Sequence, residues 1–537
     1  MKKALFTILF LAQLILINGY AQTTNQFKPA VFADENRKAK LQAAMPLVED
    51  LYKAYATKHH FPAYAFAIVL DGELLYKKAA GWANIEEKIP ANDETMFRIA
   101  SMSKSFTTMA ILQLRDAGKL RLDDPVNQYI PAMKGQVLTK DGAPITIRHL
   151  MSHQAGFPED NPWGDRQLDD SEADLIALIE KGLSFSNTTG SYYEYSNLGF
   201  AMLGYIIHQV SGLTYDAYIK QSILDPLGMQ HTTYEYRTIP KENLAKGYRT
   251  IKGNWVNVPL LKDGIYGAMG GMITSIADFA KYVALHQAAW PERNEPENNV
   301  IKRSTVREMH QPYTFIGLNP NYQFPSGKKL ATTSSYSYGL NWMHDAEGKT
   351  SIGHSGGLPG FGSNWRFMPE YGLGVLFFAN HTYAPTSTMN LIVLDTLVKI
   401  AKLQPRIVSV SPILEQRQKE LLQIIPSWEK IPAIFAENFF DDYLMDELKA
   451  EAKQLFEQAG VIKTVGKMIA ENQLRGYCIL KGTKRNLKLR FTFSIKSLSA
   501  FNSSEAYSRE YPSCFTASIT TSLSAFNSSE AYIICSL

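Results

Sequence analysis

The chain has 537 residues, of which 45% are hydrophobic, 20% charged and 12% aromatic, and its formal net charge is +4. This composition is typical of globular proteins and excludes a chain that is disordered throughout, while the length predicts two or more domains. The sequence has no basic stripe with interleaved aromatic residues, which argues against nucleic acid as a partner.

The first 21 residues have the pattern of a secretory signal peptide. Lys2 and Lys3 precede a mostly apolar stretch, residues 4–17, and small residues end at Ala21, before the predicted cleavage. The apolar stretch is shorter than the roughly 20 residues that a membrane span needs. The alternative to a cleaved signal peptide is an uncleaved membrane anchor. We therefore expect export across the inner membrane into the bacterial periplasm, and no stable membrane span elsewhere.

Residues 35–403 are predicted to form one domain with strands at both ends and helices between them. Asp71 and Gly72 separate two apolar runs, which is typical of a β-hairpin. The predicted elements are a helical lead-in at 32–59, strands at 64–70 and 73–79, a helix at 101–118, a mostly helical segment at 122–281 with a helix at 276–285, strands at 336–343, 350–353, 363–368 and 373–379, and a helix at 387–403. We expect the early and late strands to pair in one antiparallel sheet with helices packed on it.

A smaller unit is predicted after a linker at residues 404–412. Residues 413–496 are predicted as a small α+β module of unknown function, with one helix that ends at Gly460. Its predicted strands are 461–465, 473–480 and 486–493. Apolar and polar residues alternate in the last of these strands, as one buried sheet face requires.

The tail, residues 497–537, is rich in serine and carries an 11-residue duplication, because residues 497–507 recur unchanged as 522–532. A repeat this short does not make a solenoid. We predict that the tail is disordered and assign it no function.

All three cysteines lie late in the chain, at Cys478, Cys514 and Cys535. The region 101–403 therefore has no thiol nucleophile, no disulfide and no cysteine metal site. A Cys514–Cys535 pair is possible in an oxidising compartment, but the odd count leaves one thiol over.

Ser101-Met102-Ser103-Lys104 places a hydroxyl and an amine three residues apart at a predicted helix start. At this spacing both side chains lie on one helical face. A serine hydroxyl becomes a nucleophile when a neighbouring base takes its proton, and a partly desolvated lysine can be that base. The Ser-x-x-Lys pattern also occurs by chance at exposed helix starts, so the companion motifs decide its meaning.

Two companions follow in order, Tyr195-Ser196-Asn197 before an apolar helical stretch and His354-Ser355-Gly356-Gly357 in a Gly-rich strand-and-turn segment. The ordered set resembles the penicillin-recognising serine hydrolases: class C β-lactamases, DD-peptidases, D-aminopeptidases and related esterases. Segments at 148–157, 224–229 and 270–279 are also similar to this family, and the resemblance covers about residues 48–403. It implies an α/β (α+β) fold of the β-lactamase/transpeptidase type, with a five-stranded-type antiparallel sheet flanked by helices and a mostly helical lobe.

The resemblance implies a role for each motif residue of the first two groups. Ser101 would be the nucleophile, with either Lys104 or Tyr195 as its base. A phenol at Tyr195 can also relay a proton to the leaving group and activate the deacylating water. The amide of Asn197 could hold Lys104 and bind a substrate amide.

The third motif supplies substrate contacts, from His354, Ser355 and Gly356, and the backbone amides of Ser101 and Gly357 would form the oxyanion hole of the resemblance. The β-lactamases and DD-peptidases of this type usually carry lysine where this chain has His354. The charge of a histidine is conditional, so a His354 that binds the substrate carboxylate or supports Tyr195 is expected to titrate near its unperturbed value of about 6.5. This departure favours D-amino-peptide or ester hydrolysis over penicillin hydrolysis.

Other candidates are weaker. His149 and His153 are predicted to be structural, because no Glu follows the first as in His-Glu-x-x-His, and we expect no metal and no cofactor. Gly267, Gly270 and Gly271 are predicted to shape the rim of the site, since no Gly-Lys-Ser/Thr follows. There is no Gly-x-Ser-x-Gly around the proposed nucleophile, which argues against an α/β-hydrolase.

These observations predict an exported serine hydrolase that acts through an acyl-enzyme on amide or ester bonds of D-amino-acid peptides, peptidoglycan-like peptides or small esters. The alternatives are a class C-like β-lactamase and a non-catalytic penicillin-binding sensor. The expected partner is a small-molecule or peptide substrate, and the oligomeric state is open.

Overall fold

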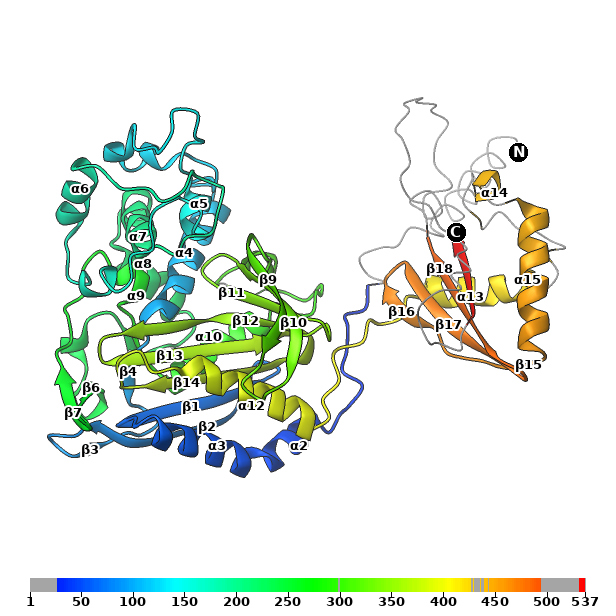
Figure 1. Cartoon of the computed structure of the whole chain (residues 1–537), viewed down its shortest axis with the longest axis horizontal. Coiled ribbons are helices and arrows are strands. Elements are labelled where there is room, and N and C mark those ends of the chain that lie inside the picture. The colour runs from blue at the N-terminus through cyan, green and yellow to red at the C-terminus, as the bar shows by residue number, and fades with distance from the viewer. Residues whose placement is uncertain are drawn as a thin grey trace, which may run out of the picture. The chain divides into compact units, whose positions relative to one another are not determined.

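The computed structural model describes residues 27–297, 300–425, 444–493 and 531–536, together with 428, 435 and 439–442. The predicted signal peptide, residues 1–21, lies outside them, as does most of the predicted tail. The chain forms two compact units, of which the larger comprises Asp34–Pro291 and Pro296–Pro405 and the smaller lies mainly after Arg406 (Figure 1). The change of unit falls inside the segment predicted as a linker, residues 404–412.

The larger unit is built on one nine-stranded antiparallel sheet, in the order β3-β2-β1-β14-β13-β12-β11-β10-β9. Its strands are β1 (Ala63–Leu70), β2 (Glu73–Asn84), β3 (Ile89–Pro90), β9 (Thr314–Gln323), β10 (Lys329–Tyr336), β11 (Asn341–Asp345), β12 (Thr350–Leu358), β13 (Phe361–Met368) and β14 (Leu373–Ala379). β1 pairs with β14, so the sheet joins the two ends of the unit and the predicted fold class is confirmed. Asp71 and Gly72, at φ 53° and 83°, form the predicted tight turn between β1 and β2.

The sheet is wider than the five-stranded type that the resemblance implied. β3 and β9 were not predicted, nor was β10 apart from its last residue, Tyr336. The strand predicted at 336–343 is interrupted by a turn in which the Ser337 N–H donates to the Leu340 carbonyl at 2.7 Å. Gly339 in this turn has φ 70°, and a Cβ there would lie 2.5 Å from Oγ1 of Thr108. The turn is therefore set by close packing against a helix, which no local pattern reveals.

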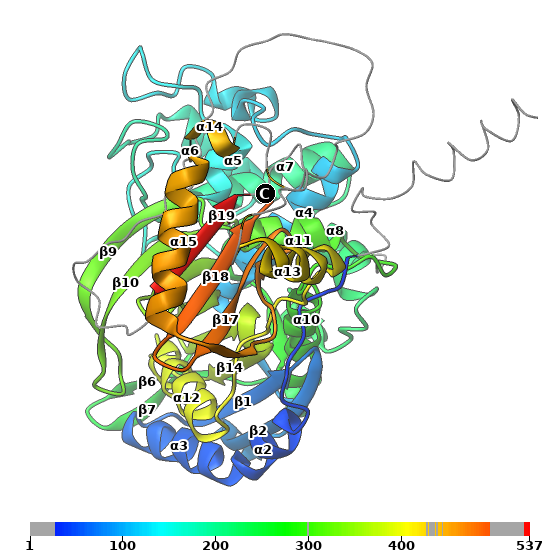
Figure 2. The same ribbon diagram turned by 90° about the vertical axis from the view of Figure 1, so that its right-hand side faces the viewer.

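Alternating side chains of the central strands enter two separate cores. Phe66 and Phe377, which pair across β1 and β14, point into a core where Tyr52 stacks on Phe66 with ring centroids 4.1 Å apart. Phe378 points to the opposite face, where its ring centroid lies 5.7 Å from that of Phe279. The helices that supply the first core are α2 (Arg37–Ala43), α3 (Met45–Lys58) and α12 (Thr386–Ile400), and those of the second include α4 (Lys104–Asp116) and α10 (Ile276–Gln287) (Figures 1 and 2).

A mostly helical lobe follows α4, as predicted (Figure 1). Its helices include α5 (Ile147–Met151), α6 (Glu172–Glu180), α7 (Asn197–Ser211), α8 (Tyr215–Ile219) and α9 (Gly267–Gly270), and α7 packs against α4, α5 and α9. Short strands that were not predicted also occur in the larger unit: β4 (Met96–Arg98) before α4, and β5 (Thr232–Thr233), β6 (Gly247–Ile251), β7 (Asn254–Val258) and β8 (Ile273–Ser275) after it.

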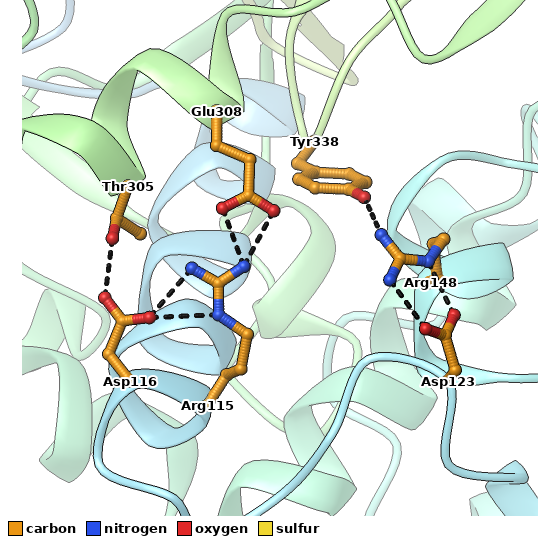
Figure 3. A network of polar contacts seen from close by, with 7 residues as sticks. All are labelled: Arg115, Asp116, Asp123, Arg148, Thr305, Glu308 and Tyr338. Atoms are coloured by element: carbon orange, nitrogen blue, oxygen red, sulfur yellow. Dashed lines mark hydrogen bonds and ion pairs between the residues drawn. The ribbon is translucent and has the colours of Figure 1, made fainter. Parts of the chain in front are cut away.

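The C-terminal end of α4 is fixed by a polar network (Figure 3). Nη1 of Arg115 donates to both carboxylate oxygens of Glu308 in α11 (Arg303–Met309), each at 2.7 Å. The hydroxyl of Thr305 donates to Asp116 at 2.6 Å. Because both contacts join α4 to α11, they hold the helix that begins at Lys104.

The smaller unit packs helices against a second sheet, whose strand order is β15-β17-β18-β19 with β16 beside β17. Its elements are α13 (Pro412–Ile424), α14 (Phe439–Asp442), α15 (Met445–Ala459), β15 (Ile462–Val465), β16 (Ile469–Asn472), β17 (Arg475–Gly482), β18 (Asn486–Thr492) and β19 (Ala531–Ser536). Leu487, Leu489 and Phe491 alternate into the core, as the sequence pattern indicates.

The prediction of a disordered tail is wrong for residues 531–536, which form β19 and pair in parallel with β18. This segment contains Tyr532, Ile533 and Ile534, residue types that favour strands, although it begins inside the serine-rich repeat. Among the helices that the structure describes, none has the length and apolar character to cross a membrane.

Candidate active site

Ser101 and Lys104 meet at the junction of a 3₁₀ turn, η2 (Ala100–Ser103), and α4. Side chains three residues apart eclipse each other in a 3₁₀ turn. Lys104 Nζ accordingly lies 3.0 Å from Ser101 Oγ. Ala100, just before the serine, has φ 51°, a strained conformation for a non-glycine residue of the kind found at active sites.

Lys104 is completely buried and makes two further contacts, to Oδ1 of Asn197 at 2.8 Å and to the Met269 carbonyl at 2.9 Å. Both partners can only accept hydrogen bonds. In the neutral amine the two N–H groups serve these acceptors, so the lone pair is left for the hydroxyl of Ser101. The geometry thus fits a lysine base.

Burial lowers the pKa of Lys104 to about 7, because a charged amine loses its hydration there. The nearby carboxylates of Asp165 and Asp160 act in the opposite direction and keep the pKa from falling further. A substantial fraction of the amine is therefore neutral near pH 7.

Tyr195 lies two residues before α7 and packs its ring against His153, with centroids 4.3 Å apart. Lys104 Nζ is 4.9 Å from the centre of the Tyr195 ring. Burial raises the pKa of the Tyr195 phenol well above 10, while a hydrogen bond with Ser101 lowers it. Since this phenol keeps its proton near neutral pH, the electrostatics favour Lys104 as the base and Tyr195 as a proton donor.

Asn197 connects the lysine to a loop that the sequence analysis missed. Its Nδ2 donates to Oδ1 of Asn161 at 2.6 Å, and the carboxylate of Asp160 accepts from the N–H groups of Asn197 and Leu198 at 2.7 and 2.8 Å. A carboxylate at a helix N-terminus satisfies free N–H groups and the helix dipole. These contacts are tertiary, so no periodicity or motif could have identified the loop.

His354 in β12 is nearly fully buried and uses both ring nitrogens. Nδ1 lies 2.6 Å from the Ser355 carbonyl, which can only accept, so Nδ1 carries the proton. Nε2 then accepts from the Tyr336 hydroxyl at 3.0 Å. Burial, with a smaller effect from Lys104, lowers the pKa of His354 to about 3. The expected titration near 6.5 is therefore wrong, because the imidazole stays neutral.

The glycines of the third motif allow β12 to approach η2, the turn that carries Ser101. A Cβ on Gly356 would lie 2.1 Å from the Ile99 carbonyl, and one on Gly357 would lie 2.8 Å from the Tyr383 ring. The strand pairs with β11 only as far as Gly353, so its remaining residues present an open edge on that side, next to η2. Ser355 receives a hydrogen bond from Asn364 at 2.9 Å. The oxyanion role of Ser101 and Gly357 remains a prediction.

A cavity of about 550 Å³ opens at Ser101. Of the predicted site residues, six line it: Ser101, Tyr195, His354, Ser355, Gly356 and Gly357. Lys104 and Asn197 lie buried behind them. The structure thus brings together all eight residues chosen from the sequence.

The weaker candidates have structural contacts. His149 accepts from the Thr146 N–H at 3.1 Å in the cap of α5. His153 accepts from the Ser196 N–H at 3.1 Å and lies under Tyr195, so it supports the site without lining the cavity.

The glycines predicted to shape the rim of the site lie in tightly packed surroundings. Gly270 lies close to Ala100, and a Cβ on Gly267 would lie 1.9 Å from Asp263.

Comparisons with known proteins agree with this geometry. A family model described as Beta-lactamase matches residues 48–397. Protein flp of Staphylococcus aureus (strain COL) is 27% identical over 332 residues, which cover 61% of this chain and 62% of that protein. Penicillin-binding protein 4* of Bacillus subtilis (strain 168) is 27% identical over 336 residues, 58% of this chain and 67% of that one. This chain therefore spans about three fifths of the length of protein flp.

Two solved structures share the fold. The octameric penicillin-binding protein homologue from Pyrococcus abyssi has a TM-score of 0.56 and 23% identity, covering 83% of this chain and 90% of its own. A class C beta-lactamase has a TM-score of 0.53 and 20% identity, covering 68% of this chain and 99% of its own.

Proposed function

Because the chain belongs to the Beta-lactamase family of serine hydrolases, we propose that it cleaves amide or ester bonds through an acyl-enzyme on Ser101. The observation that carries the proposal is the set of three contacts around Lys104 Nζ, of which two are to obligate acceptors and the third is to Ser101 Oγ. This arrangement aims the lone pair of a buried amine at the hydroxyl.

In the acylation step the neutral amine of Lys104 takes the proton of the Ser101 hydroxyl while Oγ bonds to the substrate carbonyl carbon. The carbonyl oxygen becomes an oxyanion, which the backbone N–H groups of Ser101 and Gly357 stabilise. When the bond to the leaving group breaks, Tyr195 gives its proton to the leaving group and regains one from the Lys104 ammonium. Water attacks the acyl-enzyme by the same transfers in reverse and releases Ser101.

Substrates with an extended backbone suit this site, since the open edge of β12 can pair with a peptide strand. We propose D-amino-acid peptides, peptidoglycan-like peptides or small esters. Hydrolysis of β-lactams ranks second, because His354 is neutral and offers no permanent charge to a substrate carboxylate. The alternative from a class other than enzymes is a penicillin-binding sensor, which is acylated but does not release the product.

The test is incubation of the full chain with a nitrophenyl ester and with a labelled penicillin, followed by peptide mass spectrometry. We expect an adduct on Ser101, product release from the ester, and neither with Ser101→Ala. Ser103→Ala is the matched control, since Ser103 does not line the cavity and its Oγ donates to the Ala100 carbonyl at 2.7 Å and accepts from the Met272 N–H at 3.2 Å. Hydrolysis that survives Ser101→Ala would refute the proposal, while a stable adduct without product would indicate the sensor.

We further propose export, on the strength of the signal pattern in residues 1–21. Fractionation of bacterial cells that express the full gene should place the protein in the periplasm, with an N-terminus at Gln22. An intact N-terminus in the membrane fraction would instead indicate an uncleaved anchor.

A further inference from the structure

One wall of the active-site cavity carries acidic side chains. The acidic wall consists of Asp165, Glu159 and Tyr383, and all three residues line the cavity together with Ser101. Among the described residues, no Lys or Arg lines this cavity. The wall therefore presents negative charge to a substrate, with no cation to balance it from within the lining.

Asp165 is only 2% exposed, yet it forms no ion pair in the described part of the chain. The Tyr383 hydroxyl donates to its Oδ2 at 2.9 Å, which satisfies one of its two oxygens. Glu159 is exposed, and its carboxylate receives one hydrogen bond, from Asn161 at 3.2 Å. Buried carboxylates are ordinarily paired with a cation, so an unpaired one that lines a substrate cavity calls for a cationic group from the substrate.

Tyr383 is held in an unfavourable backbone conformation to complete this wall. Its φ is 49°, and its N–H donates to the Phe361 carbonyl at 3.1 Å. The ring lies against Gly357, so that any Cβ there would be 2.8 Å from it, while 44% of the residue remains exposed. An exposed phenol ring beside a carboxylate is a favourable surface for an ammonium group.

The acidic wall is rigidly tied to the catalytic centre. Gly164, next to Asp165, packs so tightly on Asn197 that a Cβ would lie 2.9 Å from its side chain. Asn197 in turn holds Lys104. The position of the wall relative to the nucleophile is therefore fixed before a substrate enters.

We propose that the acidic wall binds a protonated amine of the substrate, so that the preferred substrates are amides or esters whose acyl part carries a free ammonium group. This inference rests on the proposed function, and names the substrate class for it.

Binding of an ammonium group has a consequence for the base. Asp165 and Asp160 favour the charged form of Lys104. An ammonium beside Asp165 offsets that carboxylate and repels the proton on Lys104, so it shifts the lysine toward its neutral, proton-accepting form. The other ionisable groups around the amine do not counter this, since the pKa values of His153 and His354 are lowered and that of Tyr195 is raised. Burial raises the pKa of the Asp165 carboxyl itself, while the hydrogen bond from Tyr383 and the charges of Lys104 and Arg166 lower it, so a cation from the substrate would stabilise its charged form further. Arg166 is exposed and does not line the cavity.

The test compares the p-nitroanilides of D-alanine and of D-lactic acid, which are nearly equal in size. The D-alanine compound carries an ammonium group where the D-lactic acid compound carries a hydroxyl. We expect the full chain to prefer the D-alanine compound by about tenfold or more in kcat/KM, as one well-placed charge contact allows. Asp165→Asn keeps an acceptor for Tyr383 but removes the charge, and should abolish most of the preference. Asp169→Asn is the matched control, since this exposed carboxylate lies in the same loop but not in the cavity, and should keep the preference.

Glu159→Gln provides a second test if Asp165→Asn does not fold. Glu159 is exposed, so this substitution should not disturb folding, and it should reduce the preference for the D-alanine compound on its own. The apparent pKa in kcat should also be lower for the D-alanine compound than for the D-lactic one. Equal kcat/KM values for the two compounds in the wild type, or a preference that Asp165→Asn and Glu159→Gln both retain, would overturn the inference. Failure of the proposed function looks different, since neither anilide nor an activated ester would then be cleaved.

Discussion

The larger unit buries Lys104 and His354 around one cavity, whereas the smaller unit buries mainly apolar side chains, such as Leu487 and Leu489 on one face of β18. Burial of a polar group costs free energy unless partners replace its hydration. The larger unit supplies those partners, with three contacts at Lys104 Nζ and two at the ring of His354. Titratable groups that are buried with hydrogen-bond partners and have shifted pKa values are concentrated at active sites. The catalytic reaction is therefore expected in the larger unit.

The sharpest test of this contrast removes the amine at the centre of the buried polar cluster. Lys104→Ala should lower kcat/KM toward an activated ester by about 10³-fold or more, because nucleophile and base act as one unit. Steady-state assays with the purified full chain measure the loss of kcat/KM. Thermal unfolding of the variant and the wild type shows whether the fold is retained. Activity within tenfold of wild type would mean that another group, with Tyr195 first, takes the serine proton.

The pH dependence of the wild type follows from the pKa of Lys104. Only the neutral amine accepts a proton, and its pKa lies at about 7. Below that pH, kcat/KM for a neutral ester should fall by about tenfold for each pH unit, and it should level off above it. A profile that is flat from pH 5 to 7 would contradict the assignment of Lys104 as base.

Asn197→Asp should move that profile. The change places a carboxylate where Oδ1 now lies 2.8 Å from Lys104 Nζ, which favours the charged amine and raises its pKa by about 1–3 units. At pH 7 the rate should fall by about tenfold or more and recover as the pH rises. Asn127→Asp, at an exposed position, is the control and should leave the profile unchanged. A loss that high pH does not restore would indicate a structural defect instead.

A smaller effect is expected at His354. Its pKa of about 3 lies below any practical assay range, so His354→Gln should cost less than about tenfold and leave the shape of the pH profile between 5 and 7 unchanged. Its effect on stability has a definite sign. The unfolded imidazole gains a proton below pH of about 6.5 and the folded one does not until far lower, so this contribution is lost as the pH falls through that window. A step near 6.5 in the wild-type profile that His354→Gln removes would show that the imidazole titrates during catalysis.

Local sequence patterns predicted whatever depends on neighbours in the chain. The alternation of Leu487 and Leu489 identified β18, and the Asp71-Gly72 turn identified the hairpin. The three motifs contain all eight candidate residues, and the spacing of Ser101 and Lys104 by itself brings their side chains within hydrogen-bond distance.

Features that depend on tertiary contacts could not be predicted. The turn at Gly339 exists because Thr108 of α4 leaves no room for a side chain. The loop with Asp165 has no periodicity, and it is held by hydrogen bonds to the start of α7. Tyr383 depends on a strained φ that the sequence does not signal. The residues proposed to bind the substrate are thus less visible in the sequence than those proposed to perform the reaction.

The smallest effect is expected when the smaller unit is removed. Each described residue that lines the cavity belongs to the larger unit, and each unit has its own apolar core. A chain that ends at Pro405 should therefore keep kcat/KM within about twofold of the full chain, as separate cores allow. Leu489→Ala in the full chain is the companion variant: it should destabilise the smaller unit by about 2–5 kcal/mol in unfolding experiments, again without a change in kcat/KM. If either change lowers kcat/KM severalfold while the larger unit still melts at its original temperature, the smaller unit contributes to the reaction and the contrast between the two units fails.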